Sequence, residues 1–236
     1  MIDGEVEHED FHGHRGVIGK GDVQWMTAGK GIMHCEMATS ETVPGVGFQL
    51  WINLANKVKF CEPGYQEFTS NQVPLWQDEE KGVSARVIAG DVFGVKGPIE
   101  ARTPTYYIDF WLDKKGDKHR HTIPGGWNVL VFIYKGKATI NGSPKEYAGL
   151  HALTFNRCGY SEDIVVTAAD NNTKFILLAG QPLDEPIINY GPFVLASHED
   201  MAKCFDDYHL GINGFENSRQ WRSEIKKNYK FRAKSV

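Results

Sequence analysis

The sequence predicts an all-β protein made of two antiparallel β-modules, with short helices near its C-terminal end. Most of the chain consists of short runs in which apolar and polar side chains alternate, which is the period of a β-strand. Clusters of glycine and proline separate these runs, for example Pro124-Gly125-Gly126. The 236 residues, 41% of them hydrophobic, are enough for two modules that each bury a core. Many short strands between turns are typical of sandwiches and barrels.

The expected strands follow one another along most of the chain. In the run FQLWINL, residues 48–54, four apolar side chains alternate with Gln49, Trp51 and Asn53, so we expect a strand with one apolar face. The other expected strands cover residues 83–90, 105–112, 128–142, 151–155, 163–169 and 174–180.

The pattern changes from strands to helices after Pro192. Ser197 and Asp200 fit a capping box, so we expect a helix that begins there and ends at Gly211. We expect a second helix over residues 215–227.

From residue 216 to the end there are seven Lys or Arg and two Asp or Glu, a local net charge of +5. This indicates a solvated terminal helix and tail, with contact to a nucleic acid or acidic partner as the alternative.

Charge and composition exclude several classes of protein. The chain carries 26 Lys plus Arg against 30 Asp plus Glu, a net charge of −4, so a polybasic DNA-binding protein is excluded. Its first ten residues are acidic and lack the apolar segment of a signal peptide. No apolar run approaches the roughly 18–20 residues of a membrane span. The four cysteines lie far apart, which favours a reducing compartment, the cytosol or the nucleus.

A histidine and a glutamate form the main candidate for chemistry. If residues 32–37 are extended, His34 and Glu36 point to the same face, because side chains alternate along a strand. An imidazole beside a carboxylate supplies two of the ligands that a non-haem iron, manganese or zinc site needs. Alone, such a pair is more typical of a protein surface than of a metal site. The surrounding sequence distinguishes the two interpretations.

That surrounding sequence resembles a known family. The pattern G-x5-T-A-G-x4-H, from Gly21 to His34, resembles the second motif of the cupin superfamily, in which a metal-binding histidine follows a turn between barrel strands. Over nearly the whole chain the sequence resembles the pirin family in the segments HEDFHGHRG, GDVQWMTAGKGIMHCEM, GFQLWINL, RTPTYYIDFWL, EPIINYGPFV and NGFE.

The resemblance implies a bicupin, two antiparallel β-barrels with terminal helices. We therefore expect an N-terminal barrel over residues 1–100, a C-terminal barrel without metal over residues 101–196, and helices with a basic tail over residues 197–236. It also implies an iron site in the N-terminal barrel, held by three histidines and one glutamate. Of these ligands, His34 and Glu36 match. The H-x-H pair of the first cupin motif would fall before Met1, so we expect an incomplete site with doubtful iron occupancy.

Two other histidine groups attract attention. His12 and His14 form an H-x-H with His8 nearby, which we interpret as a polar loop, with a rebuilt metal site as the alternative. His119 and His121 form a second H-x-H. The region near Tyr160 offers no further histidine, so we interpret these two as loop residues.

The resemblance leaves three hypotheses about function. The first is a regulatory protein of the nucleus, also present in the cytoplasm, that acts through a protein partner such as a transcription factor or a G-protein subunit. Such a protein would not bind specific DNA sequences directly and would not bind a membrane. The second is an iron enzyme similar to quercetin 2,3-dioxygenase, with a flavonol ligand and Glu36 as the catalytic group that takes the hydroxyl proton. The third is a paralogue or incomplete gene product that has lost both activities.

Overall fold

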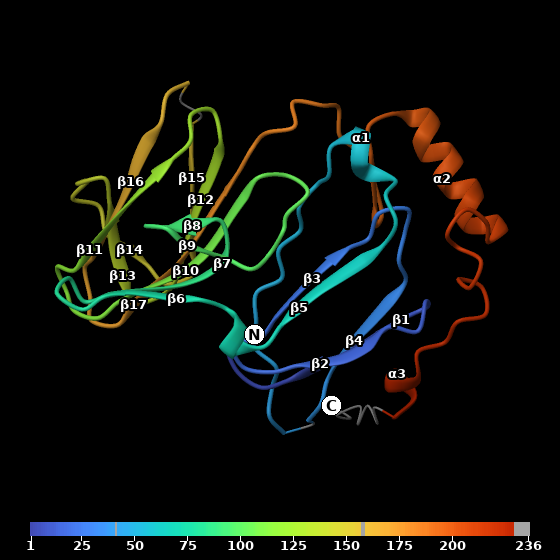
Figure 1. Cartoon of the computed structure of the whole chain (residues 1–236), viewed down its shortest axis with the longest axis horizontal. Coiled ribbons are helices and arrows are strands. Elements are labelled where there is room, and N and C mark those ends of the chain that lie inside the picture. The colour runs from blue at the N-terminus through green and yellow to red at the C-terminus, as the bar shows by residue number, and fades with distance from the viewer. Residues whose placement is uncertain (41, 157–158, 229–236) are drawn as a thin grey trace, which may run out of the picture. The chain divides into compact units, whose positions relative to one another are not determined.

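A computed structural model describes residues 1–40, 42–156 and 159–228, and these residues form two compact units (Figure 1). Unit 1 combines the two ends of the chain, residues 1–70 and 184–236, and unit 2 is the continuous segment of residues 71–183. The described residues contain no helix that is long and apolar enough to cross a membrane.

Unit 1 contains two small sheets, a hairpin and the helices. Its strands are β1 (Val6–Asp10), β2 (Arg15–Ile18), β3 (Val23–Thr27), β4 (His34–Ala38), β5 (Gly64–Phe68), β18 (Ile188–Tyr190) and β19 (Phe193–Leu195). Its helices are α1 (Asn56–Lys59), α2 (His198–Leu210) and α3 (Glu224–Asn228), and the 3₁₀ turn η1 (Ser70–Gln72) lies at its border with unit 2.

Strand β1 lies at the centre of the first sheet, whose order is β2-β1-β4, and β3 pairs with β5 in a separate ladder. Both ladders are antiparallel. A second layer comes from the far end of the chain, because α2 and the β18–β19 hairpin share an apolar cluster with the N-terminal segment. The buried members of this cluster are Phe11, Leu195, Met201, Cys204 and Phe215.

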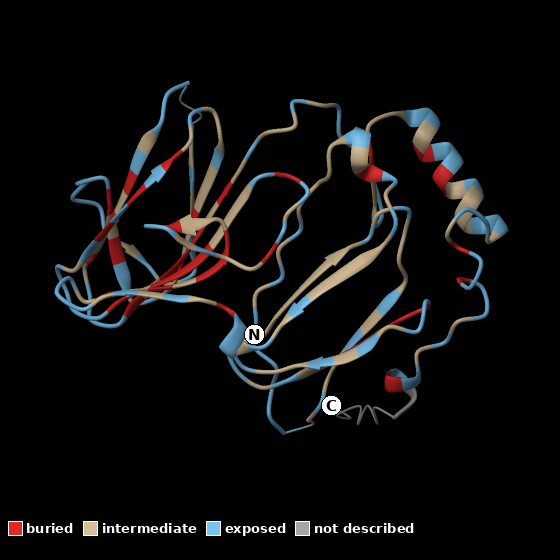
Figure 2. Ribbon diagram, in the orientation of Figure 1, coloured by how far each residue is buried: buried red, intermediate tan, exposed pale blue. Residues whose placement is uncertain are grey.

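Unit 2 contains two larger sheets around one core. Its strands are β6 (Leu75–Asp78), β7 (Val83–Ala89), β8 (Asp91–Val92), β9 (Val95–Lys96), β10 (Thr105–Leu112), β11 (Lys118–Ile123), β12 (Asn128–Lys135), β13 (Lys137–Ile140), β14 (Tyr147–Ala148), β15 (His151–Phe155), β16 (Glu162–Ala168) and β17 (Thr173–Gly180). The sheets have the orders β15-β12-β17-β10-β7-β6 and β11-β16-β13-β14. Inward side chains from both sheets meet in a single cluster, including the fully buried Phe110, Phe175 and Val166. The buried residues gather on these strands (Figure 2).

The structure confirms the predicted all-β class, in antiparallel sheets, and most of the predicted strands. It also confirms the first helix. The Ser197 side chain caps α2 by accepting a hydrogen bond from the Asp200 backbone at 3.0 Å, and Gly211 ends the helix in the left-handed conformation, with φ of 70°.

Two predicted elements are wrong. Residues 48–54 form no strand, and Trp51 is 71% exposed, because this alternating run finds no neighbouring strand to pair with. The second helix begins at Glu224 instead of residue 215, since the preceding residues form turns.

The end of the expected basic tail, residues 229–236, lies outside the described residues. So does Cys158, while Cys35, Cys61 and Cys204 are free thiols.

The division into units differs from the ranges 1–100, 101–196 and 197–236 expected from the sequence. Residues 71–100 belong to unit 2, because β6 and β7 extend the sheet that β10 and β17 form. Residues 184–228 belong with the N-terminal segment, because the β18–β19 hairpin and α2 complete its apolar cluster. Unit 2 is therefore a continuous insertion between the two segments of unit 1.

Candidate functional site: two histidine groups of unit 1

The predicted pair His34 and Glu36 lies on β4, as expected. Both side chains are about one-third exposed, and His34 Nδ1 lies 3.8 Å from Glu36 Oε1. Gln49 donates a hydrogen bond of 3.3 Å to the other carboxylate oxygen of Glu36. The alternation along β4 therefore places an imidazole and a carboxylate on one face, where both donors can meet a common ligand.

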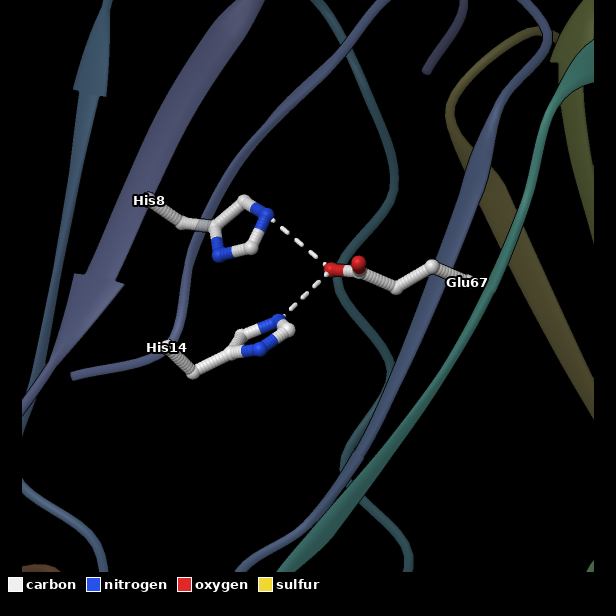
Figure 3. A group of neighbouring side chains, drawn as sticks. All are labelled: His8, His14 and Glu67. Atoms are coloured by element: carbon white, nitrogen blue, oxygen red, sulfur yellow. Dashed lines mark hydrogen bonds and ion pairs between the residues drawn. The ribbon is translucent and has the colours of Figure 1, made fainter. Parts of the chain in front are cut away.

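A second group of side chains brings together His8, His14 and Glu67. His8 lies on β1, His14 lies in the turn between β1 and β2, and Glu67 lies on β5. The Nε2 atoms of both histidines lie 3.1 Å from Glu67 Oε1. Figure 3 shows both rings converging on this one carboxylate. One donor atom from each residue lies within 4.8 Å of the other two, a spacing that could hold a metal ion.

Asp10 and Tyr65 hold His14 in place. The Asp10 carboxylate accepts hydrogen bonds of 2.9 Å from the backbone amides of His12 and His14, which fixes the tight turn after β1. The Tyr65 hydroxyl donates to the other Asp10 oxygen at 2.8 Å. The Tyr65 ring also stacks on the His14 ring, with the centroids 3.9 Å apart. The position of His14 is therefore set by contacts from two separate sheets of unit 1.

Burial and hydrogen bonds shift the pKa values in this group. Burial lowers the pKa of His8 from its ordinary value, although the charge of Glu67 opposes this shift. Burial raises the pKa of Glu67, but hydrogen bonds from Gln24 and His14 outweigh it and leave that pKa below its ordinary value. The folded environment thus favours a neutral imidazole at His8 and a carboxylate at Glu67, the protonation states in which both groups bind metals.

The second H-x-H, His119 and His121, was predicted to lie in a loop, and this prediction is wrong. Both residues lie on β11, where they are 4% and 8% exposed, and their Nε2 atoms have no hydrogen-bond partner among the described residues. They alternate with Ile123 along the strand and point into the core of unit 2, where the His119 ring lies 4.2 Å from the ring of Phe110, measured between centroids.

The pair His34 and Glu36, predicted as the remaining part of a four-ligand iron site, gains no third ligand among the described residues. Among the described residues, no further His, Cys, Asp or Glu atom joins His34 and Glu36 in a group with metal-ligand spacing. Two His and one carboxylate are the usual minimum for non-haem iron. The pair on β4 supplies one of each.

Sequence reasoning missed Glu67 altogether and favoured a polar loop for the other two residues of the second group. The structure brings His8 and His14 together, but exposed His12 is not part of the group. The segment GYQEF of β5 did carry one signal, because alternation places Tyr65 and Glu67 on the same face of a strand. Nothing in the sequence indicated that this face meets β1.

These features define the chain as a protein of the cupin class, two β-modules with histidine and carboxylate groups on the strands of one of them. Models of this class match in two places: the model described as pirin matches residues 1–52, and the pirin C-terminal cupin domain matches residues 107–214. The chain belongs to the pirin family.

Individual relatives agree with this assignment. A pirin-like protein of Solanum lycopersicum is 42% identical, with 95% of this chain and 75% of that protein covered. Pirin of Homo sapiens is 40% identical, over 94% of this chain and 75% of that protein. Among solved structures, quercetin 2,3-dioxygenase from Acinetobacter baumannii is similar with a TM-score of 0.79 and 34% identity, over 89% of this chain and 72% of that one.

Proposed function

We propose that this chain is a regulatory member of the pirin family that works by binding a protein partner in the nucleus, and also in the cytoplasm. The observation that carries the proposal is the similarity over nearly the whole chain to relatives named pirin, for example 40% identity to pirin of Homo sapiens over 94% of this chain. The net charge of −4 favours a protein partner, a transcription factor or a G-protein subunit, over direct contact with DNA.

Quercetin 2,3-dioxygenase activity is the second candidate, because the chain is 34% identical to an enzyme of that name over most of its length. Iron, when bound in such enzymes, supplies the dioxygen chemistry. In this chain the Glu36 carboxylate is one-third exposed and would accept the hydroxyl proton of a flavonol.

One experiment with two arms separates these functions. In the first arm, the chain reconstituted with Fe²⁺ is tested for quercetin-dependent oxygen uptake, with Glu36→Gln as the matched variant. In the second arm, proteins from a nuclear extract that bind the immobilised chain are identified, and each purified partner is assayed for DNA affinity or GTP hydrolysis with and without the chain.

The regulatory function predicts no oxygen uptake and a change of about fivefold or more in the partner's affinity or rate. Oxygen uptake that disappears in Glu36→Gln would assign the enzyme instead. A chain that is inactive in both arms has neither function, and that result would also overturn the proposal.

A further inference from the structure

We infer that His8, His14 and Glu67 form a binding site for one divalent transition-metal ion of the zinc class, with ligands other than the pair on β4, although Glu36 of that pair lies opposite His8. The geometry of this group supports the site independently of the proposed regulatory function.

The donor atoms are already arranged around one point. In a tetrahedral zinc site with ordinary bond lengths, ligand atoms lie about 3.4 Å from one another. Both imidazole nitrogens lie 3.1 Å from Glu67 Oε1, and all three donor atoms lie within 4.8 Å of each other. The two histidine–carboxylate distances therefore lie within a few tenths of an ångström of the spacing in a zinc site. Two histidines and one carboxylate also leave a fourth position open, as in catalytic zinc sites.

The buried nitrogen of His8 is the second observation. The His8 side chain is 3% exposed, and its Nε2 atom has no hydrogen-bond partner among the described residues, although it lies close to the Glu67 carboxylate. A buried polar atom without a partner costs about 1–3 kcal/mol. When the imidazole is neutral and Nε2 carries the lone pair, that lone pair faces a negatively charged oxygen. A cation between the two groups turns this repulsion into two favourable bonds.

The protein also leaves room for the His8 ring. Gly16 lies directly opposite His8 on β2, and a Cβ atom at this glycine would be 2.6 Å from His8 Nε2. Any larger residue would push the ring away from Glu67. Gly16 therefore permits the ring position that the three-donor group requires.

Supporting contacts fix the other two donors. Gln24 lies opposite Glu67 in the β3–β5 ladder and donates a hydrogen bond of 2.9 Å to its Oε1 atom. Asp10 and Tyr65 hold His14, as described above. Outer contacts of this kind orient ligands and are typical of metal sites. His14 and Glu67 are both about one-third exposed, so an ion can reach the group from solvent.

The ligand chemistry selects the class of ion. Imidazole suits zinc, copper, nickel and iron, and a site with one carboxylate and two imidazoles binds these ions more tightly than it binds Mg²⁺ or Ca²⁺, which prefer oxygen ligands. Zn²⁺ is the natural test ion, and Co²⁺ can replace it as a spectroscopic probe.

The test uses the full chain after metal removal with a chelator. Calorimetric titration with Zn²⁺ is expected to show one ion bound per chain, and Co²⁺ is expected to give the intense visible absorption of a tetrahedral site. His14→Ala and Glu67→Gln should each weaken Zn²⁺ binding at least tenfold, about the loss that even outer-shell changes cause. Gly16→Ala should weaken it as well while keeping all three donors. The thermal midpoints of the metal-free variants show whether each one is folded.

Two matched controls make the result specific. His12→Ala removes an exposed histidine of the same turn and should leave binding unchanged. His34→Ala, on the neighbouring strand β4, should also leave it unchanged. Zn²⁺ binding that is lost in His34→Ala but kept in His14→Ala would overturn the inference and assign the ion to the pair on β4. Absence of one-to-one binding in the unmodified chain, or a loss of affinity in His12→Ala equal to that in His14→Ala, would overturn it too.

Discussion

The two buried histidines of β11 are neutral in the folded protein. Burial lowers the pKa of His119 to about 3, with a further contribution from His121, and burial lowers the pKa of His121 to about 4. In the unfolded chain both would titrate near the ordinary value of 6.5. Below that pH the unfolded state therefore binds protons that the folded state does not bind, and stability falls as the pH decreases.

This difference predicts an acid-sensitive unit 2. Between pH 6.5 and pH 5 each histidine should remove about 2 kcal/mol from the free energy of unfolding, which can be measured by urea denaturation at several pH values. His119→Gln should reduce the slope of this free energy against pH by about one proton. His151→Gln, which changes an exposed histidine of the same unit, should keep the slope. An unchanged slope in His119→Gln would show that His119 is protonated in the folded state.

The same two histidines show why the prediction of a loop at His119 and His121 is wrong. The run KHRHTI alternates His119, His121 and Ile123 with charged or polar residues, which is the pattern of a half-buried strand. Because histidine is polar, the sequence predicts a loop here, although the buried side chains of β11 alternate with exposed ones as in any strand. His34 and Glu36 were placed on one face correctly because a single strand fixes both. The place of Glu67 in the second group depends on its contact with His14, which lies 53 residues away in the sequence. No local pattern can reveal such a contact.

Among the elements, α2 has the best-defined ends. The Ser197 hydroxyl accepts a hydrogen bond from the Asp200 amide and donates one of 2.7 Å to the Asp200 carboxylate. Local signals of this kind act within a few residues, which is why the sequence predicted both ends of this helix. Strand pairing depends on distant partners, and residues 48–54 failed as a predicted strand for that reason.

The cap of α2 gives a prediction for this element. Ser197→Ala should lower the thermal stability of unit 1 by about 1 kcal/mol, because the amide of Asp200 loses its acceptor. Ser197→Thr keeps a hydroxyl that can accept from the Asp200 amide and donate to the Asp200 carboxylate, and should stay within about half a kcal/mol of the unmodified chain. Equal losses in the two variants, measured by thermal denaturation, would mean that the hydroxyl does not act as a cap.

At the scale of the whole molecule, the two units differ in how much apolar surface they bury. The core of unit 2 joins side chains from both of its sheets, including the fully buried Phe110, Phe175 and Leu112. Unit 1 has small sheets and a cluster built around Phe11 and Phe215. Since burial of apolar surface is the main source of stability, unit 2 should be the more stable unit.

Limited proteolysis tests this difference. A protease of broad specificity should first cut within residues 1–70 or 184–236 and leave a resistant fragment that covers unit 2, which mass spectrometry would identify. Addition of Zn²⁺ should slow the cuts in unit 1 and leave the lifetime of the unit 2 fragment unchanged, because a ligand stabilises only the unit that binds it. Early cuts inside residues 71–183 would contradict the predicted order of stability.

The insertion of unit 2 between the two segments of unit 1 has a consequence for synthesis on the ribosome. Unit 2 is complete once residue 183 has left the exit tunnel, and domains generally fold as soon as they are whole. The segment with His8 and His14 is made before unit 2, but contacts that hold it come from residues made after unit 2. The side chain of Asn217 donates to the Phe11 carbonyl, and the Ile225 amide donates to Glu9. Residues 9 and 11 therefore emerge before unit 2 but obtain these partners only after the whole of unit 2 has been translated.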